Sequence, residues 1–277
     1  MVWASLCAAA GLVLEPGEPV DLTLMLPDPA VIETRLESAE RQDGGAWETT
    51  TSAWRVEVRP DGEGGYRAVW HDLDDPAASA MVIEADESLT PIRILNQDEL
   101  LKGLTSGEDA EVANFLRGLP RETLSALLTR DLILAAYGQG TDLIPGERVE
   151  YRQPGGSLGD SGPLMMNASF TLESAKPGER AVVVWTSEVD PDEARKAMPG
   201  LIRDMFGLAG ADADDAEKLT ALMMDAKFEI RQECRYQIDV PTGLSLRTEC
   251  SSVKDIVIGG ERNHKETRLV ATQRLID

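Results

Sequence analysis

The chain has 277 residues, of which 42% are hydrophobic, and this is enough for a packed core in one large β-rich domain or two smaller ones. Its formal net charge is −22. Such an excess of acid argues against nucleic acid or an anionic membrane surface as the partner, because both would repel the chain.

Residues 2–14 are uncharged and almost wholly apolar, and Ala8 and Ala10 are spaced like a small-residue cleavage site. The stretch is too short to be a transmembrane segment, which takes about 20 apolar residues. Residues 1–10 therefore resemble the end of a secretory signal whose basic start is missing; the alternative is a hydrophobic first strand. Removal of this segment would also remove Cys7 and leave two cysteines.

Alternation of apolar and polar residues predicts antiparallel strands over much of the first hundred residues. The alternating apolar positions are Val20, Leu22, Leu24 and Leu26; Trp54, Val56 and Val58; Tyr66, Ala68 and Trp70; Met81, Ile83 and Ala85; and Ile92 and Ile94. The period then becomes helical, with a capping box at 106–109 and leucines at helical spacing between Pro120 and Gly138.

Strands resume over residues 148–152, 164–172 and 181–189. The Asp-Pro-Asp-Glu sequence at 190–193 then begins a second helical stretch, with Asp190 as its cap, and a further helical segment covers 214–225. A last strand is expected over residues 267–275.

The sequence Val-Pro-Thr-Gly at 240–243 predicts a hairpin turn with Gly243 in the left-handed conformation. With a three-residue loop, Val240 faces Leu244, Ile238 faces Leu246, and Cys234 faces Cys250. Side chains alternate in the same register, so both cysteines fall on the apolar face. We predict a Cys234–Cys250 disulfide, which persists only in an oxidising compartment; the alternative is two buried thiols in a reduced protein.

These elements together predict an α+β fold: a large curved, mostly antiparallel half-barrel-like sheet with two helical insertions packed on its concave face. Residues 11–277 are interpreted as a single β-rich domain, with the insertions at about 97–138 and 191–225. The glycine- and proline-rich stretch at 153–163 is interpreted as a long hairpin loop rather than a domain boundary.

The element order and the sequence Tyr-Gln-Ile-Asp-Val-Pro-Thr-Gly-Leu at 236–244 resemble the bacterial periplasmic half-barrel carriers of lipids and lipoproteins. This resemblance implies a periplasmic or secreted, non-catalytic protein that binds an apolar small molecule, a lipid or an envelope protein. A plain core without a cavity would give the same apolar face. A structural or protein-interaction module of the cell envelope is the alternative function.

The Gly-Asp-Ser-Gly-Pro sequence at 159–163 is similar to the nucleophile motif of trypsin-like serine proteases, so a hydrolase using Ser161 is a second alternative. The motif lacks one glycine, and His71 has none of the residues that surround the base in that family. The two histidines are far apart, and no Cys-x-x-Cys or glycine-rich phosphate motif is present. We therefore predict no catalytic, metal or cofactor residues.

Overall fold

The computed structural model describes residues 19–105, 114, 116–136, 142–154, 165–176, 178–197, 200, 226–258 and 260–276. The first strands are β1 (Val20–Asp21), β2 (Ala30–Gln42), β3 (Glu48–Pro60), β4 (Tyr66–Asp72), β5 (Met81–Ala85), β6 (Pro91–Ile94) and β7 (Asp142–Leu143). The later strands are β8 (Arg148–Pro154), β9 (Met165–Lys176), β10 (Arg180–Val189), β11 (Lys227–Asp239), β12 (Ser245–Ile258) and β13 (Glu261–Ile276). The helices are α1 (Gln97–Leu104) and α3 (Arg121–Ala136), and residues 191–197 are also helical.

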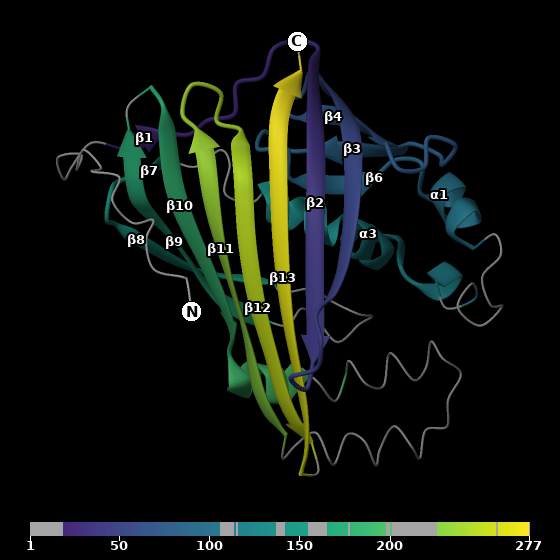
Figure 1. The fold of residues 1–277 in the computed structure, drawn as a ribbon, viewed down its shortest axis with the longest axis vertical. Helices are drawn as coiled ribbons and strands as arrows, with labels where there is room; N and C mark the ends of the chain where they lie inside the picture. Colours follow the sequence, from purple (N-terminus) through teal and green to yellow (C-terminus); the bar gives the residue numbers. More distant parts are fainter. Residues whose placement is uncertain are drawn as a thin grey trace.

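Eleven strands form one antiparallel sheet in the order β6-β5-β4-β3-β2-β13-β12-β11-β10-β9-β8, while β1 and β7 pair separately. Its long central strands lie side by side in Figure 1. The last strand, β13, lies between β2 and β12 and so joins the two halves of the chain. The sheet is open, because β6 and β8 are its two edges.

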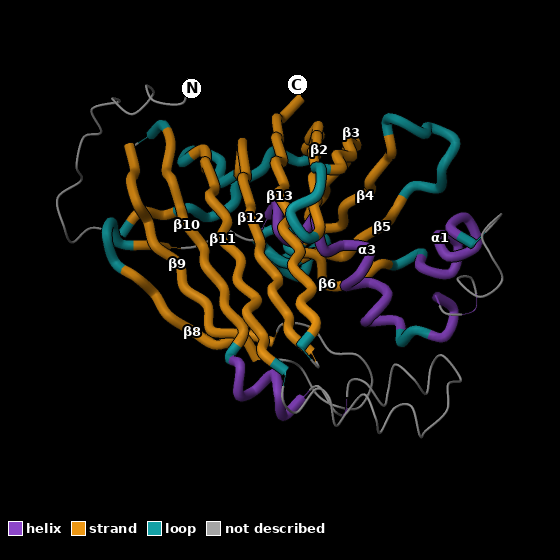
Figure 2. Tube along the Cα trace, turned by 60° about the horizontal axis from the view of Figure 1, so that its bottom comes forward, coloured by secondary structure: helices purple, strands orange, loops and turns teal. Residues whose placement is uncertain are grey.

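The sheet curves around α3. Ser125 accepts a hydrogen bond from the backbone N–H of Ile94, at the end of β6, at 3.3 Å, and Thr248 of β12 donates to the Ala135 carbonyl at 3.0 Å. Ser125 and Ala135 lie about 15 Å apart along a helix, whereas β6 and β12 would be about 29 Å apart in a flat sheet. Figure 2 shows the resulting arc, with α3 inside it. The predicted α+β class with a curved antiparallel sheet is confirmed.

The inner face of this arc carries the core. Strand β10 alternates between buried residues that point inward and more exposed ones that point outward. A cluster around Trp185, Tyr236 and Leu172 fills the centre of the sheet. Near one end, Ala194 of the helical residues 191–197 packs with Phe228. Asp190 caps this helix as predicted, because its Oδ1 accepts from the Asp192 N–H at 2.9 Å.

Two early expectations differ from the structure. The predicted strand over residues 20–26 is wrong beyond Asp21, because the chain leaves β7 there and runs over the β11–β12 turn, where the Met25 N–H donates to the Thr242 carbonyl at 2.8 Å. Strand β2 was not predicted at all. Its sequence is rich in Glu, Arg and Ala, which favour helix, and only the pairing with β13 and β3 makes it a strand.

The β11–β12 hairpin has the predicted pairing of Cys234 with Cys250, but its turn differs from the predicted three-residue loop. The loop has four residues, 240–243, and closes where the Asp239 N–H donates to the Leu244 carbonyl at 2.9 Å, so Ile238 faces Ser245 instead of Leu246. An irregularity beside Ile238 absorbs one residue of β12. The two differences cancel, and Cys234 lies opposite Cys250.

Cys234 and Cys250 are joined by a disulfide, with their Cα atoms 4.0 Å apart. Both cysteines are buried in the central core cluster. At a sequence separation of 16, the bond stabilises the fold by about 3 kcal/mol in the chain-entropy model. The remaining cysteine, Cys7, lies outside the described residues, as does the capping box at 106–109 and the segments 155–164 and 201–225.

Gly243 fixes how the N-terminal segment crosses this hairpin. Its φ is +68°, and a Cβ placed there would lie 2.3 Å from the Thr23 carbonyl oxygen. Any other residue would therefore meet both an unfavourable backbone conformation and a backbone clash. The glycine lets Leu22, which is fully buried, pass directly over the turn.

We expect Gly243→Ala to lower the free energy of unfolding by about 1–2 kcal/mol for the left-handed conformation and by a further 1–3 kcal/mol, roughly, for the clash. Gly44→Ala is the matched control, because Gly44 has φ +74° and nothing within 4 Å of its Cβ position. Urea unfolding of the two variants measures the difference. Equal losses would contradict the close passage of Thr23 over the turn.

Candidate functional site

The strand register arranges the inner face in rows that cross the sheet. One row is apolar and contains Phe170, Trp185, Cys234, Cys250 and Leu269, each directly opposite the next on neighbouring strands. The adjacent row, which we call the polar row, contains Ser187, Gln232, Ser252, Thr267, Glu40 and Glu48. The inner face therefore changes from apolar to polar between two consecutive inward positions of each strand.

A cleft of about 480 Å³ lies between α3 and the inner face of β2 and β3, where these two rows end. Its apolar lining is Leu36, Trp54, Met81, Leu127, Leu128 and Leu132. Its polar lining is Ser38, Glu40, Glu48, Thr50, Ser52, Arg130 and Asp131. The volume falls within the range of small-molecule binding sites. Leu127, on the α3 wall, keeps 52% of its surface exposed, although large apolar side chains on a core-facing helix are usually covered.

Positive side chains converge beside the polar end of the cleft. Lys254 of β12 lies directly opposite Lys265 of β13, and Lys265 pairs with the Glu40 Oε2 at 2.7 Å. Arg130 comes from α3 and pairs with its neighbour Asp131 at 2.9 Å. Desolvation by the surrounding protein lowers the pKa of Lys254 below its usual value, and the charges of Arg130 and Lys265 lower it further.

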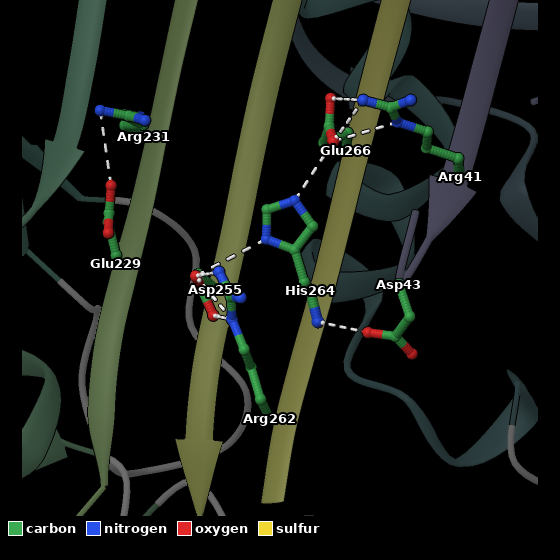
Figure 3. Close-up of polar contacts among 8 residues, drawn as sticks. All are labelled: Arg41, Asp43, Glu229, Arg231, Asp255, Arg262, His264 and Glu266. Atoms are coloured by element: carbon green, nitrogen blue, oxygen red, sulfur yellow. Dashed lines mark hydrogen bonds and ion pairs between the residues drawn. The ribbon is translucent and has the colours of Figure 1, made fainter. Parts of the chain in front are cut away.

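The outer face carries a separate charged network, drawn in Figure 3. His264 of β13 lies between Glu266, whose Oε1 is 3.2 Å from Nε2, and Asp255, whose Oδ2 is 3.6 Å from Nδ1. Hydrogen bonds from Arg41 hold the pKa of Glu266 below its usual value, and those from Arg262 do the same for Asp255. Glu266 and Asp255 each already have a guanidinium partner, so the network joins β2, β12 and β13 rather than offering a free charge.

The same network extends to an aromatic ring. Trp47, in the β2–β3 connection, lies between two guanidinium groups, with the Arg41 Cζ 4.8 Å and the Arg268 Cζ 4.4 Å from its ring centroid. Such contacts stabilise by about 0.5–1 kcal/mol each at exposed sites. They explain this tryptophan as part of the outer face and not of the cleft.

Of the residues weighed for a hydrolase, the structure describes the two histidines. His71 and His264 are both on the outer face, where His71 lies 3.8 Å from Glu57 and His264 belongs to the network above. Ser161 lies outside the described residues. Over the parts of the chain that are described, no group of three or more His, Cys, Asp or Glu side chains is placed to hold a metal ion.

Sequence reasoning missed Lys254, Lys265, Arg130 and Glu40 as site residues, although one signal was available. The Gly259-Gly260 pair between two alternating segments is a hairpin signal. It sets Ile258 opposite Glu261, and the same register brings Lys254 opposite Lys265. The approach of Arg130 from α3 has no such signal, because it depends on the curvature of the sheet.

No family model matches this chain, and no curated protein matches it. Among solved structures, the chain is similar to lipovitellin, from a study of lipid–protein interactions, with a TM-score of 0.43 and 8% identity over 89% of this chain and 25% of that chain. The chain thus spans a quarter of the lipovitellin chain. It is also similar to an outer membrane lipoprotein-sorting protein domain from Vibrio parahaemolyticus, with a TM-score of 0.20 and 10% identity over 88% of this chain and 85% of that one.

A third similar structure is DynF of the dynemicin biosynthesis pathway of Micromonospora chersina, with a TM-score of 0.18 and 7% identity over 98% of this chain and 92% of that one. The resemblance to half-barrel carriers expected from sequence thus has only weak structural counterparts. No helix in the described part of the chain has the length and apolar character to span a membrane.

Replacing Lys254 tests the electrostatics of the site. Lys254 lies opposite Lys265, and the folded state disfavours its charged form at pH 7. Because solvent screens this exposed side chain, Lys254→Met is expected to raise the free energy of unfolding by only a few tenths of a kcal/mol, roughly. Because the folded pKa is lowered, wild-type stability should rise with pH through that pKa, and the gap to the variant should shrink. Urea unfolding between pH 7 and 10 measures this, with Lys227→Met on the exposed outer face of β11 as the control. A loss of stability in Lys254→Met at pH 7 would contradict the arrangement.

Proposed function

We propose that this protein is an exported, non-catalytic carrier that holds the acyl chain of a lipid or lipoprotein in the cleft between α3 and β2–β3. The main support for this proposal is the apolar lining of the cleft. Three leucines of α3 face two large apolar side chains of the sheet: Leu127, Leu128 and Leu132 on α3, and Leu36 and Trp54 on β2 and β3. An apolar wall beside a row of hydroxyl and charged groups suits an amphiphile, whose two ends need different surroundings.

The chemistry of the cleft supports binding over catalysis. Its hydroxyl groups come from Ser38, Thr50 and Ser52, and among the described residues its lining has no histidine or cysteine. A serine or threonine nucleophile needs an adjacent base held in hydrogen-bonding distance. The carboxylates of Asp131 and Glu40 are already paired with Arg130 and Lys265. The third carboxylate, that of Glu48, forms no hydrogen bond with a hydroxyl group of the described lining, and the Thr50 hydroxyl donates to the Ser38 carbonyl instead.

Export is supported by the disulfide and by the apolar segment at residues 2–14. The Cys234–Cys250 bond joins two central strands in the buried core, and such bonds form and persist in oxidising compartments. A carrier in the periplasm or outside the cell would meet lipids in transit through water, where an acyl chain needs a protein surface to cover it.

Binding is tested with N-phenyl-1-naphthylamine, whose fluorescence rises on entering an apolar site, and with acyl amphiphiles that displace it. Leu127→Glu should weaken dye and acyl-chain binding by roughly tenfold or more, because it places a charge on the apolar wall. Ile92→Glu is the control, since Ile92 is 58% exposed on β6 and is not part of the lining. Equal binding by both variants, or no binding by the wild type, would overturn the carrier proposal.

Export is tested by the intact mass of protein purified from its native host after alkylation with and without reductant. We expect no alkylation at Cys234 or Cys250 until reductant is added, and two added groups afterwards. The same spectrum reports whether residues 1–10 are retained. Alkylation of both cysteines without reductant would refute the oxidising location while leaving the cleft and its binding test unaffected.

A further inference from the structure

The positive charges beside the cleft are unusual in a chain with a net charge of −22. Lys254 and Lys265 face each other across β12 and β13 on the inner side of the sheet. Like charges directly opposite each other in a sheet are destabilising. Arg130 adds a third positive charge from α3, so three elements bring cations to one place.

The acidic groups nearby do not neutralise all three cations. Glu40 pairs with Lys265, and Asp131 pairs with Arg130. In the described portions of the chain, no carboxylate forms an ion pair with Lys254. Glu48, the remaining acid of the lining, lies on β3 opposite Glu40 and so on the far side of Glu40 from the lysines.

The exposed side chain of Lys254 faces Lys265 across the two strands, so it adds charge repulsion to the folded protein and remains open to a ligand. Partial desolvation and the charges of Arg130 and Lys265 lower its pKa, and the charge of Glu40 opposes them. Residues that cost stability in the free protein often serve binding, where the partner supplies the missing interaction. An anion placed between Lys254, Lys265 and Arg130 would relieve the repulsion and would lie at the polar end of the cleft.

We propose that Lys254, Lys265 and Arg130 bind the anionic head group, a carboxylate or a phosphate, of an amphiphile whose acyl chain occupies the cleft between α3 and β2–β3. This assignment rests on the proposed carrier function and names the chemical class of its ligand. The apolar lining holds the chain, whichever head it carries, while the three cations select among head groups.

The test compares four amphiphiles with the same twelve-carbon chain: dodecanoate, dodecyl phosphate, dodecanol and dodecyltrimethylammonium. Displacement of N-phenyl-1-naphthylamine at submicellar concentrations gives a dissociation constant for each. We expect at least one of the two anions to bind about tenfold or more tightly than both the alcohol and the cation. Preference for one anion over the other identifies the head group as carboxylate or phosphate.

Variants separate the head-group site from the chain site. Lys254→Met should remove the preference for the anion and leave dodecanol binding unchanged, whereas Lys254→Arg should retain the preference because it keeps the charge. Lys227→Met, on the outer face, should behave as the wild type. Circular dichroism and urea unfolding verify that each variant is folded.

The outcomes separate the two proposals. If all four amphiphiles bind alike and Lys254→Met changes nothing, the head-group assignment is overturned while the carrier function stands. If none of the four displaces the dye, the carrier function falls and the assignment falls with it. A preference for the anions that survives in Lys254→Met would also overturn the role given to this lysine.

Discussion

Backbone hydrogen bonds between neighbouring strands from β8 to β3 hold the central sheet in one register, and this register decides which side chains face α3. A shift of one residue in any strand would exchange its inner and outer sets. The apolar row through Cys234 and Cys250 and the polar row beside it exist only because consecutive strands keep this alignment. The core, the disulfide and the charged end of the cleft all depend on it.

The curvature of the sheet is the second requirement, because it brings α3 close to the inner face of β2 and β3 and so forms the cleft. The sheet bends until α3 reaches both the β6 edge and β12 through Ser125 and Ala135. Polar backbone and hydroxyl groups at these two points are thereby satisfied, which matters in a buried region. Between the two contacts, α3 does not press against β2 and β3 along its whole length, and the cleft occupies that space. The outer face, with its paired charges around His264, lies on the other side of the same strands.

Much of the architecture could be predicted from local patterns. Strands β3, β4, β9 and β10 follow directly from alternation, and α3 follows from leucine spacing. Strand β2 could not be found this way, because residues with helical preference form it and pairing on both sides overrides that preference. The Cys234–Cys250 register was obtained from a turn with the wrong loop length, since the bulge in β12 compensated for the difference. The candidate site was largely missed, because α3 and the lysines of β12 and β13 reach β2 and β3 from far along the chain.

By itself, the sequence determined the class of fold, the face to which most strand residues belong and the opposition of Cys234 and Cys250, because these follow from periodicity and from contacts between neighbours along the chain. Only the tertiary structure decided that β13 lies between β2 and β12 and that the sheet curves around α3. It also brought Arg130 to the lysine pair. The physical reason is distance along the chain: β2 and β13, and α3 and β12, are separated by a hundred residues or more, and no local pattern encodes which distant partner a strand edge or a helix face will find.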